Sequence, residues 1–243
     1  MKLTLLGGGG FRVPLMFRTL LADQSDRRVT ELRLWDTDAG RLAVIRSILQ
    51  AMTQGHPKAP KVEVSQNLDE AVAGTDFVFS AIRVGGTEGR ATEETIAHCC
   101  EVLGQETTGF GGLNYALRGI PTAIRIAETI ARLAPRAHLI NFTNPAGIIT
   151  EVSSRILGDR VIGICDSPVG LARRVLETLE GAELVTAGTA SLVIAGDDRV
   201  RLDYAGLNHL GWLQRLLVDG DDMLPLLLER PDLIESFEEG RLF

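Results

Sequence analysis

Two kinds of hydrophobic pattern alternate along the first part of this chain, and the alternation restricts the possible folds more than any other feature. Short apolar runs rich in β-branched residues indicate strands, whereas longer stretches with apolar residues three or four positions apart indicate helices. Their alternation predicts an α/β fold in which a doubly wound parallel sheet carries helices on both faces. Several helices, including the one expected from residue 121, would begin with proline, whose missing N–H costs nothing there. The expected strands are 3–6, 32–35, 62–64, 77–82, 138–142 and 161–164, and the expected helices are 14–21, 41–52, 121–133, 145–156 and 168–179.

The pattern changes after about Gly181. Residues 184–185, 191–194 and 200–204 are expected to form strands, and residues 196–198 would be the hairpin turn between the last two. We therefore expect a first domain over residues 1–167 and an incomplete, mixed α+β domain over residues 168–243. Two short helices, around 224–228 and 233–237, would end the chain without a closing element.

Composition narrows the classes of function. The net charge of −7 argues against a nucleic-acid-binding protein, which normally presents a basic surface. No apolar run approaches the roughly 18 residues that a membrane helix needs. The three cysteines, Cys99, Cys100 and Cys165, are an odd number with one adjacent pair, which favours a reducing, cytoplasmic location over a disulfide framework.

Four consecutive glycines, residues 7–10, follow the first expected strand and precede a helix. Rossmann-like folds place a phosphate-binding turn here, because glycine lets the backbone approach a pyrophosphate and the helix N-terminus supplies free N–H groups. The G-x-G-x-x-G pattern is incomplete, since Arg12 holds its third glycine position, and a flexible turn is the alternative. Asp36, after the second strand, favours NAD because its carboxylate can accept hydrogen bonds from ribose hydroxyls, although it could be a plain strand-end acid.

Polar residues also gather after later strands. Arg83 and Arg90 follow the fourth strand, and their guanidinium groups suit a phosphate or a carboxylate, although each could be a solvated surface arginine. Residues 104–112 are too glycine-rich and polar for a helix or a core strand, and we expect a binding loop or a long turn. Asn144 could hold a sugar hydroxyl, cap the helix that follows, or do both.

Cys165 and His209 are candidate metal ligands, because a thiolate and an imidazole both bind divalent cations. Cys165 stands at the end of an expected strand with Asp166 next to it, and His209 follows the expected hairpin together with Asn208. The alternatives are a small buried cysteine and a histidine that is only hydrogen-bonded. The residues alone leave this choice open.

Taken together, these segments resemble glycoside hydrolase family 4, the NAD-dependent glycosidases that depart from the usual two-carboxylate mechanism. The resemblance covers nearly the whole chain in family order. It rests on residues 7–10, 83–86 with Arg90, 104–112, 141–145, 163–168 and 206–212.

The resemblance implies a role for each matching position. Cys165 and His209 would hold a divalent metal, typically manganese, and Asp166 beside them would act in acid catalysis. Arg90 and Asn144 would contact the phosphosugar. The residues that would bind NAD are Gly7, Gly9, Gly10, Phe11, Arg12 and Asp36.

The resemblance also implies the reaction, and Thr107-Thr108 resembles the 6-phospho-β-glucosidase branch. NAD would oxidise the C3 hydroxyl of a 6-phospho-β-glucoside, the aglycone would leave by elimination, and water addition with return of the hydride would complete hydrolysis. The substrate would be a phosphorylated disaccharide or an aryl phosphoglucoside. Neither nucleic acid nor a membrane would be a partner, and the full-length form would be a homo-oligomer.

The chain also departs from the family. Full members are longer, and the tyrosine assigned as the C2 base would lie beyond this chain, so the isolated chain is expected to be inactive. Glu93-Glu94 stands where the family tends to show Asp-Glu, and Phe110 replaces a proline. Two alternatives are a lactate/malate-type NAD-dependent dehydrogenase and a non-catalytic NAD-binding fragment.

Overall fold

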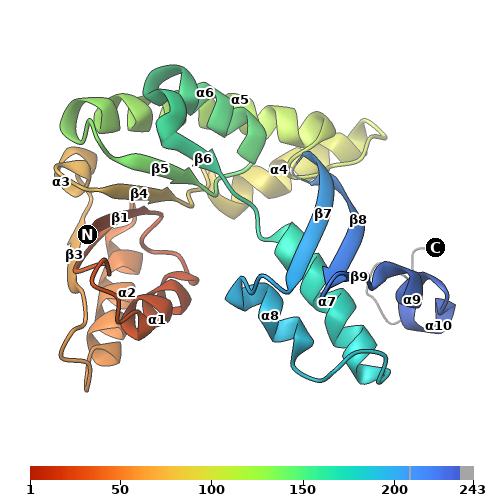
Figure 1. The fold of residues 1–243 in the computed structure, drawn as a ribbon. Coiled ribbons are helices and arrows are strands. Elements are labelled where there is room, and N and C mark those ends of the chain that lie inside the picture. Colours follow the sequence, from red (N-terminus) through yellow and green to blue (C-terminus); the bar gives the residue numbers. More distant parts are fainter. Residues whose placement is uncertain (208, 236–243) are drawn as a thin grey trace. The chain divides into compact units, whose positions relative to one another are not determined.

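The computed structural model describes residues 1–207 and 209–235, and the chain divides into two compact units, Met1–Ile164 and Cys165–Phe243 (Figure 1). Asn208 and residues 236–237 of the expected last helix lie outside the described residues. In the described part of the chain, no helix combines the length and the apolar character that crossing a membrane requires.

The first unit is built on one parallel sheet of six strands in the order β3-β2-β1-β4-β5-β6. This is the doubly wound order in which the chain starts at the centre and extends first to one side and then to the other. The prediction of a Rossmann-like α/β fold is confirmed. The strands are β1 (Lys2–Leu6), β2 (Glu31–Trp35), β3 (Lys61–Ser65), β4 (Phe77–Ser80), β5 (His138–Asn141) and β6 (Val161–Gly163).

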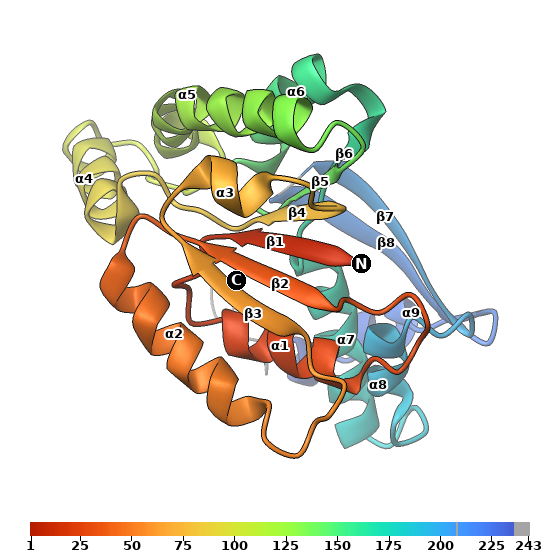
Figure 2. The same cartoon turned by 90° about the vertical axis from the view of Figure 1, so that its left-hand side faces the viewer.

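Helices cover both faces of this sheet. Figures 1 and 2 show α1 and α2 on one face and α3, α5 and α6 on the other. Successive side chains of a strand point to opposite faces, so Leu5 packs under α1 and α2 while Leu6 packs under the other layer. The helices of this unit are α1 (Val13–Ala22), α2 (Ala39–Met52), α3 (Leu68–Val72), α4 (Gly86–Cys99), α5 (Gly109–Leu133) and α6 (Ala146–Leu157), followed by a 3₁₀ turn, η1 (Gly158–Arg160).

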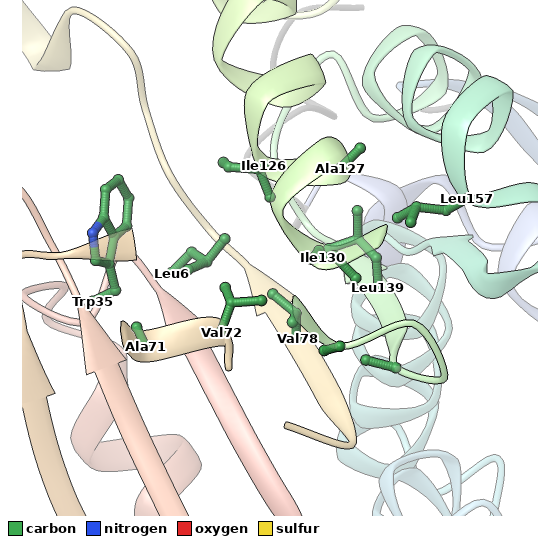
Figure 3. Close-up of a cluster of buried hydrophobic side chains, with 12 residues drawn as sticks. Leu6, Trp35, Ala71, Val72, Val78, Ile126, Ala127, Ile130, Leu139 and Leu157 are labelled. Atoms are coloured by element: carbon green, nitrogen blue, oxygen red, sulfur yellow. The ribbon is translucent and has the colours of Figure 1, made fainter. Parts of the chain in front are cut away.

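The longest helix, α5, supplies many of the buried side chains between the sheet and the layer of α3, α5 and α6. Figure 3 shows Ile126 and Ile130 of this helix beside Leu6, Val78 and Leu139 of the sheet. All five side chains are at most 2% exposed. Burial of apolar side chains on both faces makes the sheet the rigid element on which the site is built.

Two predictions about α5 were wrong. Residues 109–112, expected to be a loop, are its first turn, and Pro121 lies inside the helix instead of opening it. Close packing explains why glycines begin a helix here: a Cβ on Gly112 would lie 2.2 Å from the carbonyl carbon of Thr107, so only glycine fits.

The second unit begins with α7 (Ser167–Gly181) and α8 (Thr189–Ala195). These pack on an antiparallel sheet of β7 (Val200–Leu207), β8 (Leu210–Val218) and β9 (Asp221–Asp222), with α9 (Leu224–Leu228) and α10 (Pro231–Ile234) after it. The expected mixed α+β character is confirmed. Its core consists of Ala172, Val175, Leu176, Leu179, Ala190, Val193, Leu216 and Leu227.

The hairpin in this unit differs from the predicted one. Residues 191–194, expected as a strand, belong to α8, and residues 184–185 are not a strand either. Ala190 and Val193 are three positions apart and both face the core, as residues on one side of a helix do. The apolar run 191–194 is too short to show this helical spacing in the sequence. The long hairpin is β7–β8, so residues 196–198 connect α8 to β7.

Candidate functional site

The glycine turn lies between the ends of three neighbouring strands. The N–H groups of Gly7 and Gly8 both donate to the carbonyl oxygen of Trp35, at 2.9 and 2.8 Å. Gly7 has φ +88°, and a Cβ on it would lie 2.5 Å from the carbonyl oxygen of Ala81, just past β4. The turn therefore needs glycine to fit at the point where the strand order reverses, which is where open α/β sheets bind ligands.

Asp36 is held directly against this turn. Its Oδ2 accepts a hydrogen bond from the N–H of Gly9 at 2.9 Å, and its Oδ1 accepts one from the N–H of Asp38 at 3.1 Å. A Cβ on Gly9 would lie 3.0 Å from Asp36 Oδ2 and 2.6 Å from the Cβ of Arg41. The fold thus brings a half-buried strand-end carboxylate next to glycines 27 residues away, as a ribose-binding acid requires.

Phe11 and Arg12 complete the start of α1. Arg12 is the N-cap residue, and Phe11 is 81% exposed. The guanidinium carbon of Arg12 lies 5.5 Å from the ring centroid of Phe11 and 5.8 Å from that of Phe142, which follows β5. Arg12 thereby connects the glycine turn to the polar segment after β5.

A second cluster surrounds Glu106 in the same unit. Arg83, just past β4, forms an ion pair with Glu106 Oε1, and Arg90 Nη1 on α4 lies 3.4 Å from Glu106 Oε2. Arg90 Nε also pairs with Glu94 at 2.6 Å. The side chain of Asn144 forms a further hydrogen bond with Glu106. The structure therefore brings together Arg90 and Asn144, which the sequence singled out, and adds Glu106 as the residue that joins them.

The loop that carries Glu106 has its own local support. Gln105 Oε1 accepts hydrogen bonds from the backbone N–H groups of Thr107 and Thr108, at 2.5 and 2.8 Å. This interaction orders a segment that the sequence left open as a binding loop or a long turn. Glu106 could have been suspected, because it is the one charged residue in 104–112, a segment otherwise of glycine and uncharged side chains.

Asn144 does not cap α6. The N-cap is Pro145, with no side-chain cap hydrogen bond, so that interpretation was wrong. Asn141 orders the turn instead: it is fully buried, its Nδ2 donates to the carbonyl oxygen of Thr143 at 3.1 Å, and its Oδ1 accepts from the N–H of Thr143 at 3.1 Å. Asn144 is therefore available to Glu106.

Two opposing effects act on the ionisation of Glu106. Burial raises the pKa of this carboxyl group, but the hydrogen bond and charge of Arg83, then the charge of Arg90 and the hydrogen bond with Asn144, hold the pKa below its ordinary value of 4.5. The pKa of Arg90 is raised, chiefly by its hydrogen bond with Glu94. At neutral pH the cluster therefore consists of ionised groups of both signs.

The predicted metal ligands belong to the second unit. Cys165 is half-buried, its thiol donates to Ser167 Oγ at 3.2 Å, and its sulfur accepts from the N–H of Ser167 at 3.4 Å. Asp166 is exposed and is the N-cap residue of α7. His209 is half-buried in the turn between β7 and β8. Over residues 1–207 and 209–235, no group of three or more His, Cys, Asp or Glu side chains could hold a metal ion.

Cys165 with His209 would be a pair of protein ligands and stays a prediction. The donor chemistry fits a divalent cation. A metal binds cysteine as the thiolate, and the thiolate of Cys165 would accept hydrogen bonds from both the N–H and the hydroxyl group of Ser167. The cysteines of the chain are free.

A doubly wound parallel sheet with a glycine turn where the strand order reverses and an aspartate after β2 is the Rossmann-type arrangement of nucleotide-binding proteins. The family 4 glycosyl hydrolase profile matches residues 2–181, and the chain belongs to this family.

Relatives of both anomeric specificities are similar to the chain. The 6-phospho-β-glucosidase of Escherichia coli is 32% identical over 94% of this chain and 49% of its own length. A 6-phospho-α-glucosidase from gut microorganisms, solved with NAD and Mn²⁺, is 28% identical with a TM-score of 0.81, over 97% of this chain and 51% of the other. The Thermotoga maritima 6-phospho-β-glucosidase, solved with manganese, NAD⁺ and glucose 6-phosphate, is 28% identical with a TM-score of 0.80, over 95% and 53%.

The chain spans about half the length of the curated relatives it matches. A Plasmodium falciparum malate dehydrogenase with NADH is also similar in structure, with a TM-score of 0.64 at 14% identity. At that identity the likeness shows the shared fold alone. The family match thus favours the glycosidase prediction over the dehydrogenase alternative.

Replacing Arg83 should change the ionisation of Glu106. We expect Arg83→Gln to raise the Glu106 pKa, because Arg83 supplies the largest of the effects that lower it. Since the folded-state pKa is depressed, ionised Glu106 stabilises the fold above about pH 4.5, and this stabilisation is lost as the pH falls through the folded-state value. A ¹³C NMR titration of the glutamate carboxyl groups measures this shift. Arg155→Gln, which breaks an exposed pair with Glu151, is the control, and an unchanged Glu106 pKa in Arg83→Gln contradicts the assignment.

Proposed function

We propose that this chain carries the NAD site, the phosphosugar-binding residues and metal ligands of a hydrolase that acts on 6-phospho-β-glucosides. The observation that supports this most is the convergence of Arg83, Arg90 and Asn144 on Glu106, in the unit that also contains the glycine turn. Family membership and relatives solved with NAD, Mn²⁺ and glucose 6-phosphate support the same proposal.

NAD fits the residues of the glycine turn. A Cβ at Gly7 would clash with Ala81, and a Cβ at Gly9 would clash with Arg41 and Asp36, so the glycines let the turn pack closely on the sheet. In such a turn a pyrophosphate would bind at the start of the helix that follows, here α1. Asp36 would accept hydrogen bonds from the ribose hydroxyls and disfavour a 2′-phosphate. Gly7, Gly9, Gly10, Phe11 and Arg12 are the remaining residues that we assign to the cofactor.

The phosphosugar would be bound by Arg90 and Asn144, with Arg83 beside them. Guanidinium groups bind phosphate through charge-assisted hydrogen bonds, and the Asn144 amide can bind a sugar hydroxyl. Glu106 forms ion pairs with both arginines. A phosphate or hydroxyl would therefore bind by sharing or replacing the contacts of this carboxylate.

Cys165 and His209 would hold the divalent metal. Bound NAD supplies a hydride acceptor and the metal a Lewis acid, the two functions that make the C2 proton of a C3-oxidised sugar acidic. Asp166 would hold the proton delivered to the leaving glycosidic oxygen, since its carboxyl group is exposed next to Cys165.

Thr107-Thr108 supports specificity for β-glucosides. The relatives include enzymes of both specificities, so the activity experiment compares the α- and β-anomers of the substrate. Free thiols support a reducing compartment, and we propose a cytoplasmic enzyme. We also propose that the complete enzyme is a homo-oligomer. The units would correspond to an NAD-binding domain and part of a substrate- and metal-binding domain.

The cofactor assignment predicts a selective loss of NAD affinity. We expect Asp36→Ala to weaken NAD binding by about tenfold or more, the effect of losing hydrogen bonds to a charged group, and to reduce discrimination against NADP. Isothermal titration calorimetry with the 243-residue chain measures both affinities. Asp38→Ala is the matched control, because it removes the N-cap of α2 and costs about 1 kcal/mol of stability without touching Gly9. Equal NAD affinity in Asp36→Ala and the native chain would falsify the assignment.

The metal assignment predicts that Cys165→Ser and His209→Gln each weaken Mn²⁺ binding by at least about tenfold while NAD affinity stays unchanged. Electron paramagnetic resonance of free Mn²⁺ measures the binding. Cys99→Ser, at the exposed end of α4, should bind Mn²⁺ like the native chain. Full Mn²⁺ affinity in both site variants would remove these residues from the metal site.

Activity tests the function itself. We expect the protein that contains this chain to release p-nitrophenol from p-nitrophenyl 6-phospho-β-glucoside only with NAD, Mn²⁺ and a reductant, and to lose turnover on chelation of the metal. Faster turnover of the α-anomer would overturn the β specificity, and turnover without NAD would overturn the mechanism.

A further inference from the structure

Arg118 on α5 contacts the backbone of the turn that carries Arg83. We propose that Arg118, oriented by Glu93, is a positioning residue that holds this turn, residues 82–86, so that Arg83 and Arg90 face a common anion. The phosphosugar as that anion rests on the function proposed above. The positioning itself rests on contacts within the first unit.

The guanidinium group of Arg118 makes two contacts, one through Nε and one through Nη1. Its Nε donates to the carbonyl oxygen of Val84 at 2.8 Å, and its Nη1 forms an ion pair with Glu93 Oε1. Val84 follows Arg83 directly, and Glu93 lies on α4, the helix that also carries Arg90. One side chain therefore connects both arginine-bearing segments to α5.

The surrounding backbone leaves space for this guanidinium. A Cβ on Gly85 would lie 2.6 Å from Arg118 Nε, and a Cβ on Gly89 would lie 3.1 Å from its Cζ. Gly85 also has φ +82°, a conformation that other residues rarely adopt. The turn and the first part of α4 thus have glycine where Arg118 packs against them.

Tyr115, one turn earlier on α5, holds the other side of Arg83. Its hydroxyl donates to the carbonyl oxygen of Ile82 at 3.4 Å. Its ring centroid lies 5.1 Å from the guanidinium carbon of Arg83 and 5.4 Å from that of Arg118. The carbonyl groups on both sides of Arg83 are therefore bound by side chains of one helix, which limits how far the Arg83 backbone can move.

Glu93 determines the direction of the Arg118 side chain. Glu93 is 4% exposed, and a carboxylate that is nearly buried requires a paired cation. A planar guanidinium can bond Val84 through Nε and Glu93 through Nη1 at the same time, whereas a lysine ammonium has a single nitrogen and no such fixed arrangement of donors. Arg118→Lys therefore keeps the charge opposite Glu93 but should lose the hold on Val84.

The alternative is that Arg118 only packs α4 against α5. The residues at which hydrogen exchange increases in an Arg118 variant distinguish this packing role from the positioning role. Loss of packing would increase hydrogen exchange throughout α4 and α5. Loss of positioning would increase it over residues 82–89, where the N–H groups of Gly86 and Gly89 bond to Arg83 and Gly85.

The experiment compares the 243-residue chain with Arg118→Lys, Arg118→Gln and Glu93→Gln by hydrogen exchange with mass spectrometry, and by calorimetric titration with glucose 6-phosphate and with NAD. Arg155→Gln, on the exposed face of α6, is the matched arginine control. We expect Arg118→Lys to speed exchange over residues 82–89 by about tenfold. Exchange over residues 2–12 and NAD affinity should stay unchanged, while glucose 6-phosphate affinity falls by about tenfold.

Unchanged exchange over residues 82–89 in Arg118→Lys and Glu93→Gln overturns the positioning role, as does a uniform increase over both helices. If the native chain binds no glucose 6-phosphate but the local exchange effect appears, the positioning role stands and the phosphosugar function falls. If the native chain binds glucose 6-phosphate and Arg118→Lys binds it equally well, the positioning role is overturned while the phosphosugar function stands.

Discussion

The parallel pairing of β1 with β2 on one side and with β4 on the other is the constraint on which the candidate site depends. Parallel strands end at the same edge of the sheet, so the residues after these three strands meet there. This pairing places Asp36 and Ala81 on either side of the glycine turn. Apolar layers on both faces hold the strands in this register, since Leu5 and Leu6 belong to opposite cores.

Carboxylates inside the fold balance the arginines of the site. Glu106 pairs with Arg83 and Arg90, and Glu93 pairs with Arg118. An acidic chain can therefore carry an anion-binding cluster, because its overall charge of −7 does not determine the local arrangement of guanidinium groups. Paired charges of this kind contribute little net stability after desolvation, so their effect here lies in geometry: each carboxylate limits the directions in which its arginine can point.

The two wrong predictions about α5 share one physical cause. The sequence rules assigned glycines 109, 111 and 112 to a loop and Pro121 to a helix start, because isolated helices disfavour both residue types. Tertiary packing outweighed that preference along α5. The buried positions Tyr115, Gly119, Ala123, Ile126 and Ile130 recur every three or four residues through Pro121, so the pattern could have revealed this helix and Arg118 on it. In the second unit, the short run 191–194 had too few residues to distinguish a helix from a strand.

The sequence by itself determined the alternation of strands and helices, and hence the doubly wound sheet, because hydrophobic periodicity is local and direct to read. It also determined which glycine, aspartate and arginine residues follow the strands, because the strand ends can be located from the same periodicity. Only the tertiary structure decided that Glu106 joins Arg83, Arg90 and Asn144, and that Arg118 reaches Val84 across 34 residues. Such contacts depend on how segments that are far apart in the sequence pack in space, and no local pattern in the chain shows which of them will meet.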